Sequence, residues 1–366
     1  MSKLRILAVG DPAVYGYIEP SFKIIENYEI NEGVKIDFHI VDFKSYYQEL
    51  MSTFSSYAYD IVMIAGHLWL PEMVEKGYLK AFKFESDPDI ILSIQQEMTY
   101  KNQTYLMPSF CDGHLLVYRQ SLVKHKIGPK ISVKDLIMNV HANYHHPKIA
   151  LKAHPSELFL DVLPYVRSFH GPLFDSNNKL NLKGEKMLDG IKAYQQMLSL
   201  APKETQTFGN EEILKQIQLK KVPYAVTWGG QLGRIYTEDC IEKNDLGFAQ
   251  LVESWNVTWS FAIPHNTPQA EKAFDFMTYL ISPQVDRKIG AFCGSPIRRS
   301  TYKLDGGKYP WYKPLLQMLE EAKRLPNHPY LGSIMGALTE LYLDYLNQRI
   351  DDNEYIKQIE LINERW

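Results

Sequence analysis

Cysteine is scarce in this sequence, which has three among 366 residues: Cys111, Cys240 and Cys293. The number is odd and the spacing is wide, so the sequence offers neither a disulfide framework nor a Cys-x-x-Cys pair for a metal. We therefore expect the three cysteines to be buried free thiols.

An excess of charge of one sign is also absent. The 40 lysine and arginine residues are balanced by 43 aspartate and glutamate residues, which gives a net charge of -3. A strong field of one sign is what attracts a protein to a phosphate backbone or to an anionic membrane surface. Nucleic acid and membrane are therefore not expected as partners.

Long apolar runs are missing as well. No stretch approaches the roughly 20 apolar residues that cross a bilayer, so an integral membrane protein is not expected. Near the N-terminus only the short apolar run Ile6–Val9 precedes Gly10, and this run is too short for the core of a signal peptide. Taken alone, the composition leaves two alternatives: a cytosolic protein, or an exported one whose signal segment has been removed.

Motifs of phosphate, nucleotide and serine chemistry are missing too. The triplet Gly306–Lys308 lacks the glycine spacing and the following hydroxyl residue of a P-loop. Gly229, Gly230 and Gly233 do not match the GxGxxG fingerprint, and they follow a late strand rather than the first one. No GxSxG elbow indicates a serine hydrolase.

Metal and glycosidase sites have little support. His141 and His145 have the i, i+4 spacing that can share one metal, but the tract lacks the glutamate of HExxH, continues to His146 and is closed by Pro147. We expect a surface helix end there. With 43 acidic residues, carboxylate pairs arise by chance, so they do not indicate a glycosidase. We expect no metal, no cofactor and no enzymatic activity.

Length and aromatic content are the informative features that are present. A chain of 366 residues exceeds the usual size of one compact core, which favours two lobes. Apolar residues make up 45% and charged residues 23%, the balance of a globular protein. Aromatic residues make up 13%, more than core packing would seem to require. Some of these rings are therefore expected to face a ligand.

The first part of the chain alternates between strand-like and helix-like segments. Strands are predicted at 4–9, 34–41 and 60–65, and helices at 22–28, 46–53 and 71–76. This is a parallel α/β pattern, in which ligands lie beyond the carboxyl ends of the strands. The loops expected there carry side chains suited to a ligand: Asp11, Tyr15, Tyr17 and Glu19 after the first strand, and His67 and Trp69 after the third.

The remainder of the chain repeats the alternation. A hairpin is predicted at 98–107, and a passage between lobes at 108–114 leads into a strand at 115–118. Further strands are predicted at 148–151, 222–227 and 258–263, with helices at 133–140, 156–168, 182–200, 211–219 and 268–281. Ser282-Pro283 has the form of another helix start, and the last 60 or so residues are helix-like.

Aromatic and polar groups gather at several of the predicted strand ends. A sugar offers an apolar C–H face and a rim of hydroxyls, so its receptor needs aromatic planes together with charged or amide groups. The candidate ligand-binding set contains residues with these properties, together with two glycines that would let a ligand approach Trp228. The set is Tyr15, Tyr17, His67, Trp69, Phe110, Asp112, Trp228, Gly229, Gly230, Trp255 and Trp259.

The order of the segments resembles the family 1 extracellular solute-binding proteins, the type II periplasmic-binding fold that includes maltose and maltodextrin receptors. The resemblance covers essentially the whole chain and rests on the segments 59–79, 104–118, 222–230 and 261–298. It implies that Asp112 lies at the hinge with its carboxylate on ligand hydroxyls and that Trp228 is a stacking plane. It also implies that Trp69 and Tyr15 line the N-terminal lobe.

This chain departs from the family pattern in places. Phe110-Cys111-Asp112-Gly113 stands where many relatives have Tyr-Thr-Asp-Thr, and His67 stands where an acidic or amide group is frequent. A glycine pair common before the later crossover strand is replaced by Trp255–Trp259. The ligand therefore cannot be copied from any one relative.

The resemblance implies an α/β fold of two discontinuous lobes with a ligand cleft between them, the periplasmic binding protein-like II class. The expected lobes are 1–111 with 259–304, and 112–258 with 305–366. Hinge crossovers are expected near 108–114, 254–260 and 302–308. Closure of the lobes would then bury the ligand.

The implied function is that of the extracytoplasmic substrate-binding protein of an ABC importer. Such a protein captures a carbohydrate and delivers it to a membrane permease, acts as a monomer, and lies in the periplasm or is lipid-anchored on the outer face of the cell membrane. The implied signal segment is absent from this chain. Two alternatives stay open. The ligand could be a polyol, a phosphorylated polyol or a polyamine, or the chain could be a sugar-processing enzyme on the same fold.

Overall fold

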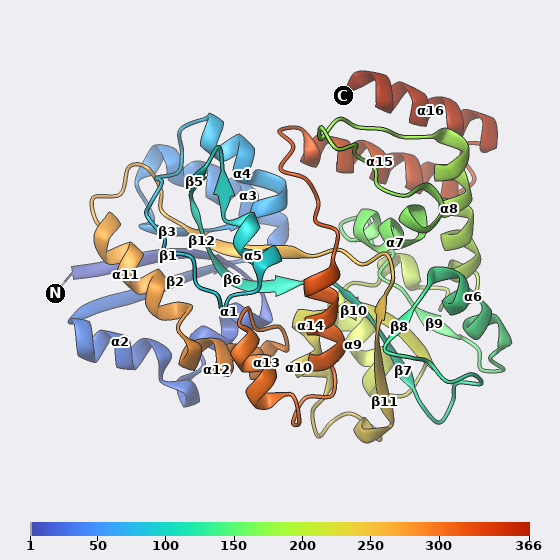
Figure 1. The fold of residues 1–366 in the computed structure, drawn as a ribbon, viewed down its shortest axis with the longest axis horizontal. Coiled ribbons are helices and arrows are strands. Elements are labelled where there is room, and N and C mark those ends of the chain that lie inside the picture. The colour runs from blue at the N-terminus through green and yellow to red at the C-terminus, as the bar shows by residue number, and fades with distance from the viewer. Residues whose placement is uncertain (1) are drawn as a thin grey trace. The chain divides into compact units, whose positions relative to one another are not determined.

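The computed structural model describes residues 2–366, which fold into two compact units (Figure 1). The first unit contains the residues up to Asp112, the short segment Leu232–Arg234 and the segment Val257–Tyr312. The second unit contains Gly113–Gln231, Ile235–Asn256 and Lys313–Trp366. Which residues move as lobes stays a prediction. Within residues 2–366, no helix is both long enough and apolar enough to cross a membrane.

The core of the first unit is a mixed sheet with the strand order β2-β1-β3-β12-β6. Its strands are β1 (Ser2–Val9), β2 (Val34–Val41), β3 (Ile61–Ala65), β6 (Leu106–Asp112) and β12 (Val257–Ala262). β1 is parallel to β2 and β3, whereas β12 is antiparallel to β3 and β6. The carboxyl ends of β1, β3 and β6 therefore meet the amino end of β12. This border of the sheet, marked by Val9, Ala65, Asp112 and Val257, is called edge 1.

Helices shield this sheet from water. α2 (Ile24–Glu32) packs on β2, α3 (Phe43–Ser56) on β1, α4 (Gly66–Glu75) on β3 and β12, and α11 (Ala270–Leu280) on β6. Every residue of β3 is buried, as expected for a strand covered on both faces. The unit also contains α5 (Leu92–Glu97), the small hairpin of β4 (Thr99–Tyr100) and β5 (Gln103–Thr104), α12 (Pro283–Cys293) and α13 (Arg299–Asp305).

Two segments predicted as loops are helices, so that part of the sequence interpretation was wrong. α1 (Pro12–Tyr17) follows β1 directly, because the Asp11 carboxylate accepts a hydrogen bond from the Ala13 N–H at 2.9 Å and proline stands at the first helical position. α4 starts at Gly66 rather than at Pro71, which lies inside the helix. Candidate residues Tyr15, Tyr17, His67 and Trp69 are therefore held on helices.

The core of the second unit is another mixed sheet, with the order β8-β11-β7-β10-β9. Its strands are β7 (His114–Arg119), β8 (Lys130–Ile131), β9 (Ile149–Ala150), β10 (Tyr224–Trp228) and β11 (Leu246–Leu251). β7 is antiparallel to β10 and β11, which are parallel to β9 and β8 respectively. The carboxyl ends of β8, β9, β10 and β11 thus meet the amino end of β7. This border, marked by His114, Ala150, Trp228 and Leu251, is called edge 2.

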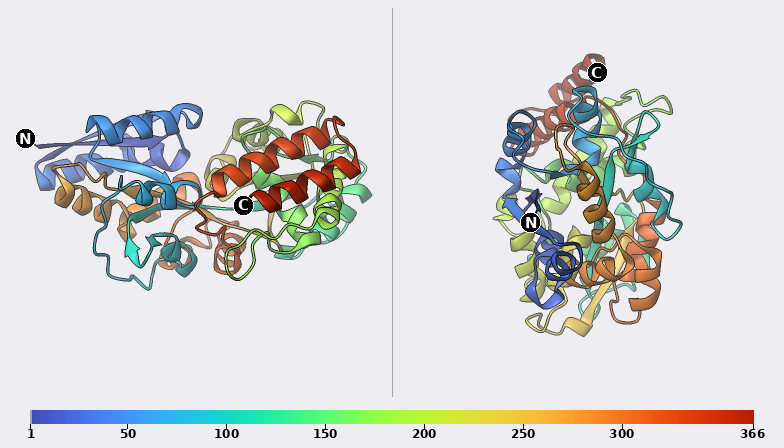
Figure 2. Two further views of the ribbon diagram at one scale, coloured as in Figure 1. Left: turned by 90° about the horizontal axis from the view of Figure 1, so that it is seen from above. Right: turned by 90° about the vertical axis from the view of Figure 1, so that its left-hand side faces the viewer.

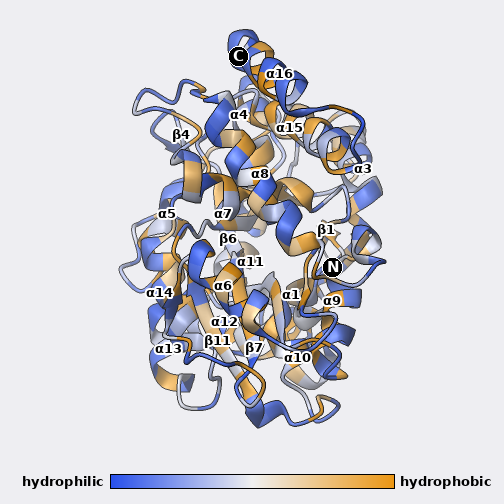
Figure 3. Ribbon diagram, turned by 90° about the vertical axis from the view of Figure 1, so that its right-hand side faces the viewer, coloured by the Kyte–Doolittle hydropathy of each residue, from blue (hydrophilic) through white to orange (hydrophobic). Residues whose placement is uncertain are grey.

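The helices of the second unit include a packed group formed by α7 (Leu158–His170), α8 (Gly184–Leu198), α15 (Leu331–Leu346) and α16 (Asp352–Arg365) (Figure 2). A Cβ on Gly190 of α8 would lie 2.6 Å from the Val166 Cα, so only glycine permits this approach of α8 to α7. Along α16, polar and apolar residues alternate with the helical period (Figure 3), and Tyr355, Ile359 and Ile362 are buried.

Shorter helices complete the chain. They are α6 (Val133–Ala142), α9 (Asn210–Gln218), α10 (Leu232–Ile235) and α14 (Tyr312–Glu321), with 3-10 turns at Pro20–Phe22, Thr205–Thr207, Gly229–Gln231 and Lys243–Asp245. α6 begins at a serine cap, because the Ser132 hydroxyl accepts from the Asp135 N–H. The prediction of buried free thiols is confirmed for Cys111, Cys240 and Cys293.

Candidate functional site

Three rings meet at edge 2. Trp228 is the last residue of β10, and the sheet register places it directly opposite His114, the first residue of β7. The two ring centroids lie 4.7 Å apart with an interplanar angle of 74°. Trp255, which follows β11, lies 4.9 Å from the Trp228 ring and 4.8 Å from the His114 ring. The three residues form a rigid aromatic cluster.

Two charged side chains fix the Trp228 indole. Its Nε1–H donates to Glu157 Oε2 at 2.8 Å, and the Lys152 Nζ lies 4.4 Å from its ring centroid. Lys152 Nζ also lies 3.7 Å from Glu157 Oε2 and donates to Asn210 Oδ1 at 3.2 Å. Lys152 follows β9 and Glu157 precedes α7, so both charges belong to edge 2. The Lys152 side chain is fully buried, whereas 20% of the Glu157 side chain is exposed.

A buried carboxylate, that of Asp161, also lies beside the cluster. Asp161 of α7 accepts from the Tyr194 hydroxyl at 2.7 Å, and its other oxygen lies 3.7 Å from His114 Nδ1. Burial raises the pKa of Asp161 to about 6, although the bond from Tyr194 and the charge of Lys152 lower it. Burial and the nearby Lys152 charge hold the pKa of His114 well below its usual value, so its imidazole is neutral at pH 7.

Glycines let the backbone of edge 2 pack closely. A Cβ on Gly113 would lie 2.4 Å from the Trp255 carbonyl oxygen, so no other residue fits there without movement. This contact accounts for the Gly113 that departs from the family pattern. Gly229 donates its N–H to the Gly113 carbonyl at 2.9 Å, and both Gly229 and Gly230 are buried.

Edge 1 carries a separate aromatic cluster. Trp259 of β12 pairs with Ala65 at the end of β3, and this register brings it to Trp69 of α4, with ring centroids 5.6 Å apart. Tyr46 of α3 is buried beneath both rings. Phe43 and Tyr47 extend the cluster to the surface, where they are 45% and 37% exposed, and both tryptophans are partly exposed. These four outer rings are called the edge 1 platform.

Polar candidates at edge 1 differ in their charge. Burial raises the pKa of Asp11 to about 7, although the Ala13 N–H and the Arg234 charge lower it. Burial lowers the pKa of His67 to about 3, so at pH 7 its neutral ring has one donor and one acceptor nitrogen. Asp112 is the last residue of β6, pairs with Val257 and is 5% exposed. Tyr15 is 48% exposed.

Two candidate residues are buried in the first unit. The Tyr17 hydroxyl lies 2.9 Å from Ser109 Oγ, and its ring packs on Phe38 and Phe261. Phe110 is fully buried within β6. Their roles in ligand binding stay predictions, as do those of the other candidates, which the structure gathers into the edge 1 and edge 2 groups.

The sequence interpretation did not single out Lys152, Glu157, His114, Phe43 or Tyr47. Lys152 and Glu157 come to Trp228 through the pairing of β9 with β10, which are separated by more than 70 residues. Phe43 lies in the predicted loop after β2 and Tyr47 lies in the predicted helix 46–53, and neither was linked to Trp69 or Trp259. A search for charged residues just after each predicted strand would have found Lys152.

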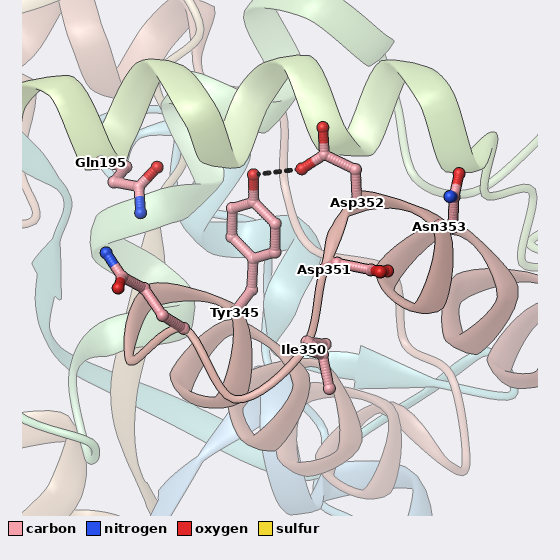
Figure 4. Close-up of a pocket in the computed structure, with 7 residues that line it drawn as sticks. Gln195, Tyr345, Ile350, Asp351, Asp352 and Asn353 are labelled. Carbon is pink, nitrogen blue, oxygen red and sulfur yellow. Dashed lines mark hydrogen bonds between the residues drawn. The ribbon is translucent and has the colours of Figure 1, made fainter.

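A surface hollow lies elsewhere in the second unit (Figure 4). It is lined by residues of α8, α15, the loop between α15 and α16, and the start of α16: Gln195, Tyr345, Gln348, Ile350, Asp351, Asp352 and Asn353. The Tyr345 hydroxyl donates to Asp352 Oδ1 at 2.8 Å, and Lys192 pairs with the other Asp352 oxygen. These contacts join the helices, and no strand ends there. Within residues 2–366, no group of three or more His, Cys, Asp or Glu side chains could hold a metal ion.

Comparisons with known proteins agree with the observed fold. A sequence model of the family described as bacterial extracellular solute-binding protein matches residues 22–287. The maltose-bound MalE3 protein of T. maritima is 16% identical, with a TM-score of 0.86, over 100% of this chain and 99% of that one. No curated protein matches the chain.

Two further solved structures are similar over the whole chain. An ABC transporter solute-binding protein from Thermotoga lettingae, bound with alpha-D-tagatose, is 18% identical with a TM-score of 0.86, over 100% of this chain and 99% of that one. Another from Agrobacterium vitis, bound with D-mannitol, is 16% identical with a TM-score of 0.82, over 100% and 98% of the chains. The predicted periplasmic binding protein-like II fold is thereby confirmed.

Proposed function

The chain belongs to the bacterial extracellular solute-binding protein family, and we propose that it captures a carbohydrate outside the cytoplasm for an ABC importer. The observation that carries this proposal is the edge 2 cluster. Trp228 lies at the end of a strand and is 9% exposed, with its indole fixed by a carboxylate and an ammonium. A fixed aromatic plane beside a partly exposed carboxylate suits a sugar, whose ring has an apolar C–H face and hydroxyls that donate to oxygen.

Charge balance at edge 2 favours an uncharged ligand. At edge 2 the buried Lys152 ammonium is matched by Glu157, and His114 is neutral. At edge 1 His67 is neutral, and Asp11 lies near the positive charge of Arg234. A phosphorylated ligand would need an unmatched cation, and a polyamine would need unmatched carboxylates. Of the alternatives, a neutral polyol fits best after a sugar.

The solved relatives support the same class of ligand. Their bound molecules are maltose, alpha-D-tagatose and D-mannitol, which are all neutral and polyhydroxylated. The edge 1 platform supplies further rings for such a molecule, and Asp112 supplies a carboxylate. We propose that residues of both edges contact the ligand, with Asp112, Trp228 and Trp69 as principal contacts.

The rest of the mechanism is part of the proposal. The ligand contacts both units only in a closed arrangement, so binding shifts the population toward closure, and the closed form delivers the ligand to a membrane permease. The protein acts as a monomer and leaves the ligand chemically unchanged. The carboxylates at edge 2 have structural partners, Asp161 with Tyr194 and Glu157 with Trp228, which suits binding rather than acid–base chemistry.

A thermal-shift screen tests the proposal. The panel contains monosaccharides, maltose and longer glucose oligomers, D-mannitol, ribitol, a sugar phosphate and spermidine. We expect the melting temperature to rise with at least one neutral sugar and to stay constant with the sugar phosphate and spermidine. A ligand present at 100 times its Kd stabilises the folded state by about 2.7 kcal/mol, which such a screen detects easily. A rise with spermidine alone would contradict the proposal.

A further inference from the structure

We infer that Glu157 and Lys152 act together as positioning residues that hold the plane of Trp228 for the ligand. The inference rests on the proposed function, because it assigns the source of the Trp228 geometry at the proposed sugar site. Glu157 holds the edge of the indole through the 2.8 Å bond to Nε1. Lys152 covers one ring face at 4.4 Å, and His114 and Trp255 pack at steep angles to the ring.

Lys152 is placed unusually for a lysine. Its side chain is fully buried, so its ammonium has lost its hydration, which is costly for a lone charge. The contacts that offset this cost are Glu157 Oε2 at 3.7 Å, Asn210 Oδ1 at 3.2 Å and the Trp228 ring. An apolar side chain of similar volume would fill the space without that cost. The retained charge is therefore explained by what it orients, namely Glu157 and the indole.

Lys152 and Glu157 would influence ligand binding in different ways. Lys152 is fully buried, so its effect on a ligand must pass through its neighbours, among them Trp228 and Glu157. Glu157 has 20% of its side chain exposed, so it has two possible routes: orientation of the indole, or a direct bond to a ligand hydroxyl. A double-mutant cycle with Trp228 separates these routes, because a residue that acts only through the indole has no effect once the indole is gone.

The size of the effect follows from the motion that the pair prevents. Ordering one rotamer-rich side chain on binding reduces affinity by a factor of roughly 2 to 10. A ring already fixed in the free protein avoids this loss. We therefore expect Glu157→Ala and Lys152→Met each to weaken binding by roughly 2- to 10-fold, and Glu157→Gln to weaken it less, since its amide oxygen still accepts from Nε1.

The first test needs no ligand. Protein with ¹⁵N-labelled tryptophan has six indole N–H groups, and the Trp228 signal is the one that disappears in Trp228→Phe. In Glu157→Gln this signal should shift and exchange faster with solvent, while the four tryptophans outside the edge 2 cluster stay in place. Glu185→Gln, which changes an exposed glutamate of α8, is the matched control and should move none of them. An unchanged Trp228 signal in Glu157→Gln would overturn the inference.

The second test measures binding by calorimetry with maltose, D-mannitol or whichever panel compound binds the wild type. Glu157→Ala should weaken binding in the wild type and have no effect in the Trp228→Phe background. An equal loss in both backgrounds would show a direct contact between Glu157 and ligand and would overturn the inference. If Glu157→Ala does not fold, Glu157→Gln and Lys152→Met carry the same cycle. A wild type that binds no panel compound would instead refute the proposed function, while the ligand-free test still decides the positioning of Trp228.

Discussion

Asp161→Asn should change how the stability of the protein depends on pH. The Asp161 side chain is 1% exposed, and burial raises its pKa from 3.8 to about 6. The native state therefore keeps a proton on Asp161 at pH values where the unfolded chain has already released it. For a carboxyl with a raised pKa, the stabilising contribution is complete below pH 3.8 and is lost as the pH rises through about 6.

The expected magnitude follows from the two pKa values. A shift of one pKa unit corresponds to 1.36 kcal/mol, so the rise to about 6 lowers the free energy of unfolding by about 2 kcal/mol between pH 4 and pH 7, with the rest of the change below pH 4. Asparagine keeps the volume and still accepts from the Tyr194 hydroxyl, which lies at 2.7 Å, but it carries no proton to lose. Asp161→Asn should therefore become more stable relative to wild type by about this amount as the pH rises.

Other titratable groups lie near Asp161, and they also affect how the stability of both proteins depends on pH. His114, Lys152 and Tyr194 lie within its network, the Glu157 charge acts on it, and Tyr165 is close enough for its pKa to respond to Asp161. These groups are present in both proteins, so their contributions largely cancel in the difference. The assay is urea unfolding of both proteins at half-unit steps from pH 4 to pH 8. A stability difference that stays constant across this range would refute the assignment of the proton to Asp161.

Further predictions concern the ligand and the closure of the protein. Asp112→Ala should weaken sugar binding by about 10- to 150-fold, because hydrogen bonds to a charged group contribute about 1.5 to 3 kcal/mol; unaltered affinity of the folded variant by calorimetry would remove Asp112 from the site. Trp228→Ala should weaken binding at least about tenfold and, because the residue is only 9% exposed, should also lower the melting temperature; normal binding by a folded variant would shift the stacking role to Trp69 and Trp259. Phe43→Ala should leave the melting temperature almost unchanged, since the ring is 45% exposed, yet weaken binding of oligosaccharides; equal affinities would place the edge 1 platform outside the site. Small-angle scattering should show a smaller radius of gyration with saturating ligand, and an unchanged radius would contradict closure.

Most strands and long helices could be predicted from the sequence, because their signals are local. β2 has the predicted bounds 34–41, and α6, α8 and α9 agree within two residues at each end. β11 was missed because Leu246–Leu251 neither alternates nor forms a β-branched run. α1 was missed because Val14 and Gly16 are weak helix formers, and the cap at Asp11 outweighs them.

The candidate site could be predicted only in part, because some of its contacts depend on strand pairing rather than on local sequence. Trp228, Trp69 and Trp259 could be singled out because each lies near a predicted strand end. The contacts that fix them could not be predicted, because these contacts depend on strand order. β9 lies beside β10, and β12 lies between β3 and β6, although their residues are far apart in the chain. Sequence spacing contains no information on such pairing, and the bond from Trp228 to Glu157 is a consequence of it.

The central claim is that the protein binds a neutral carbohydrate and returns it unchanged. The most direct measurement is calorimetric titration with each neutral sugar that raises the melting temperature, followed by denaturation of the complex and mass spectrometry of the released ligand. We expect one-to-one saturable binding and recovery of the intact sugar, with no product after prolonged incubation. Release of a cleaved or modified sugar, or the absence of saturable binding to every neutral sugar and polyol in the panel, would contradict it.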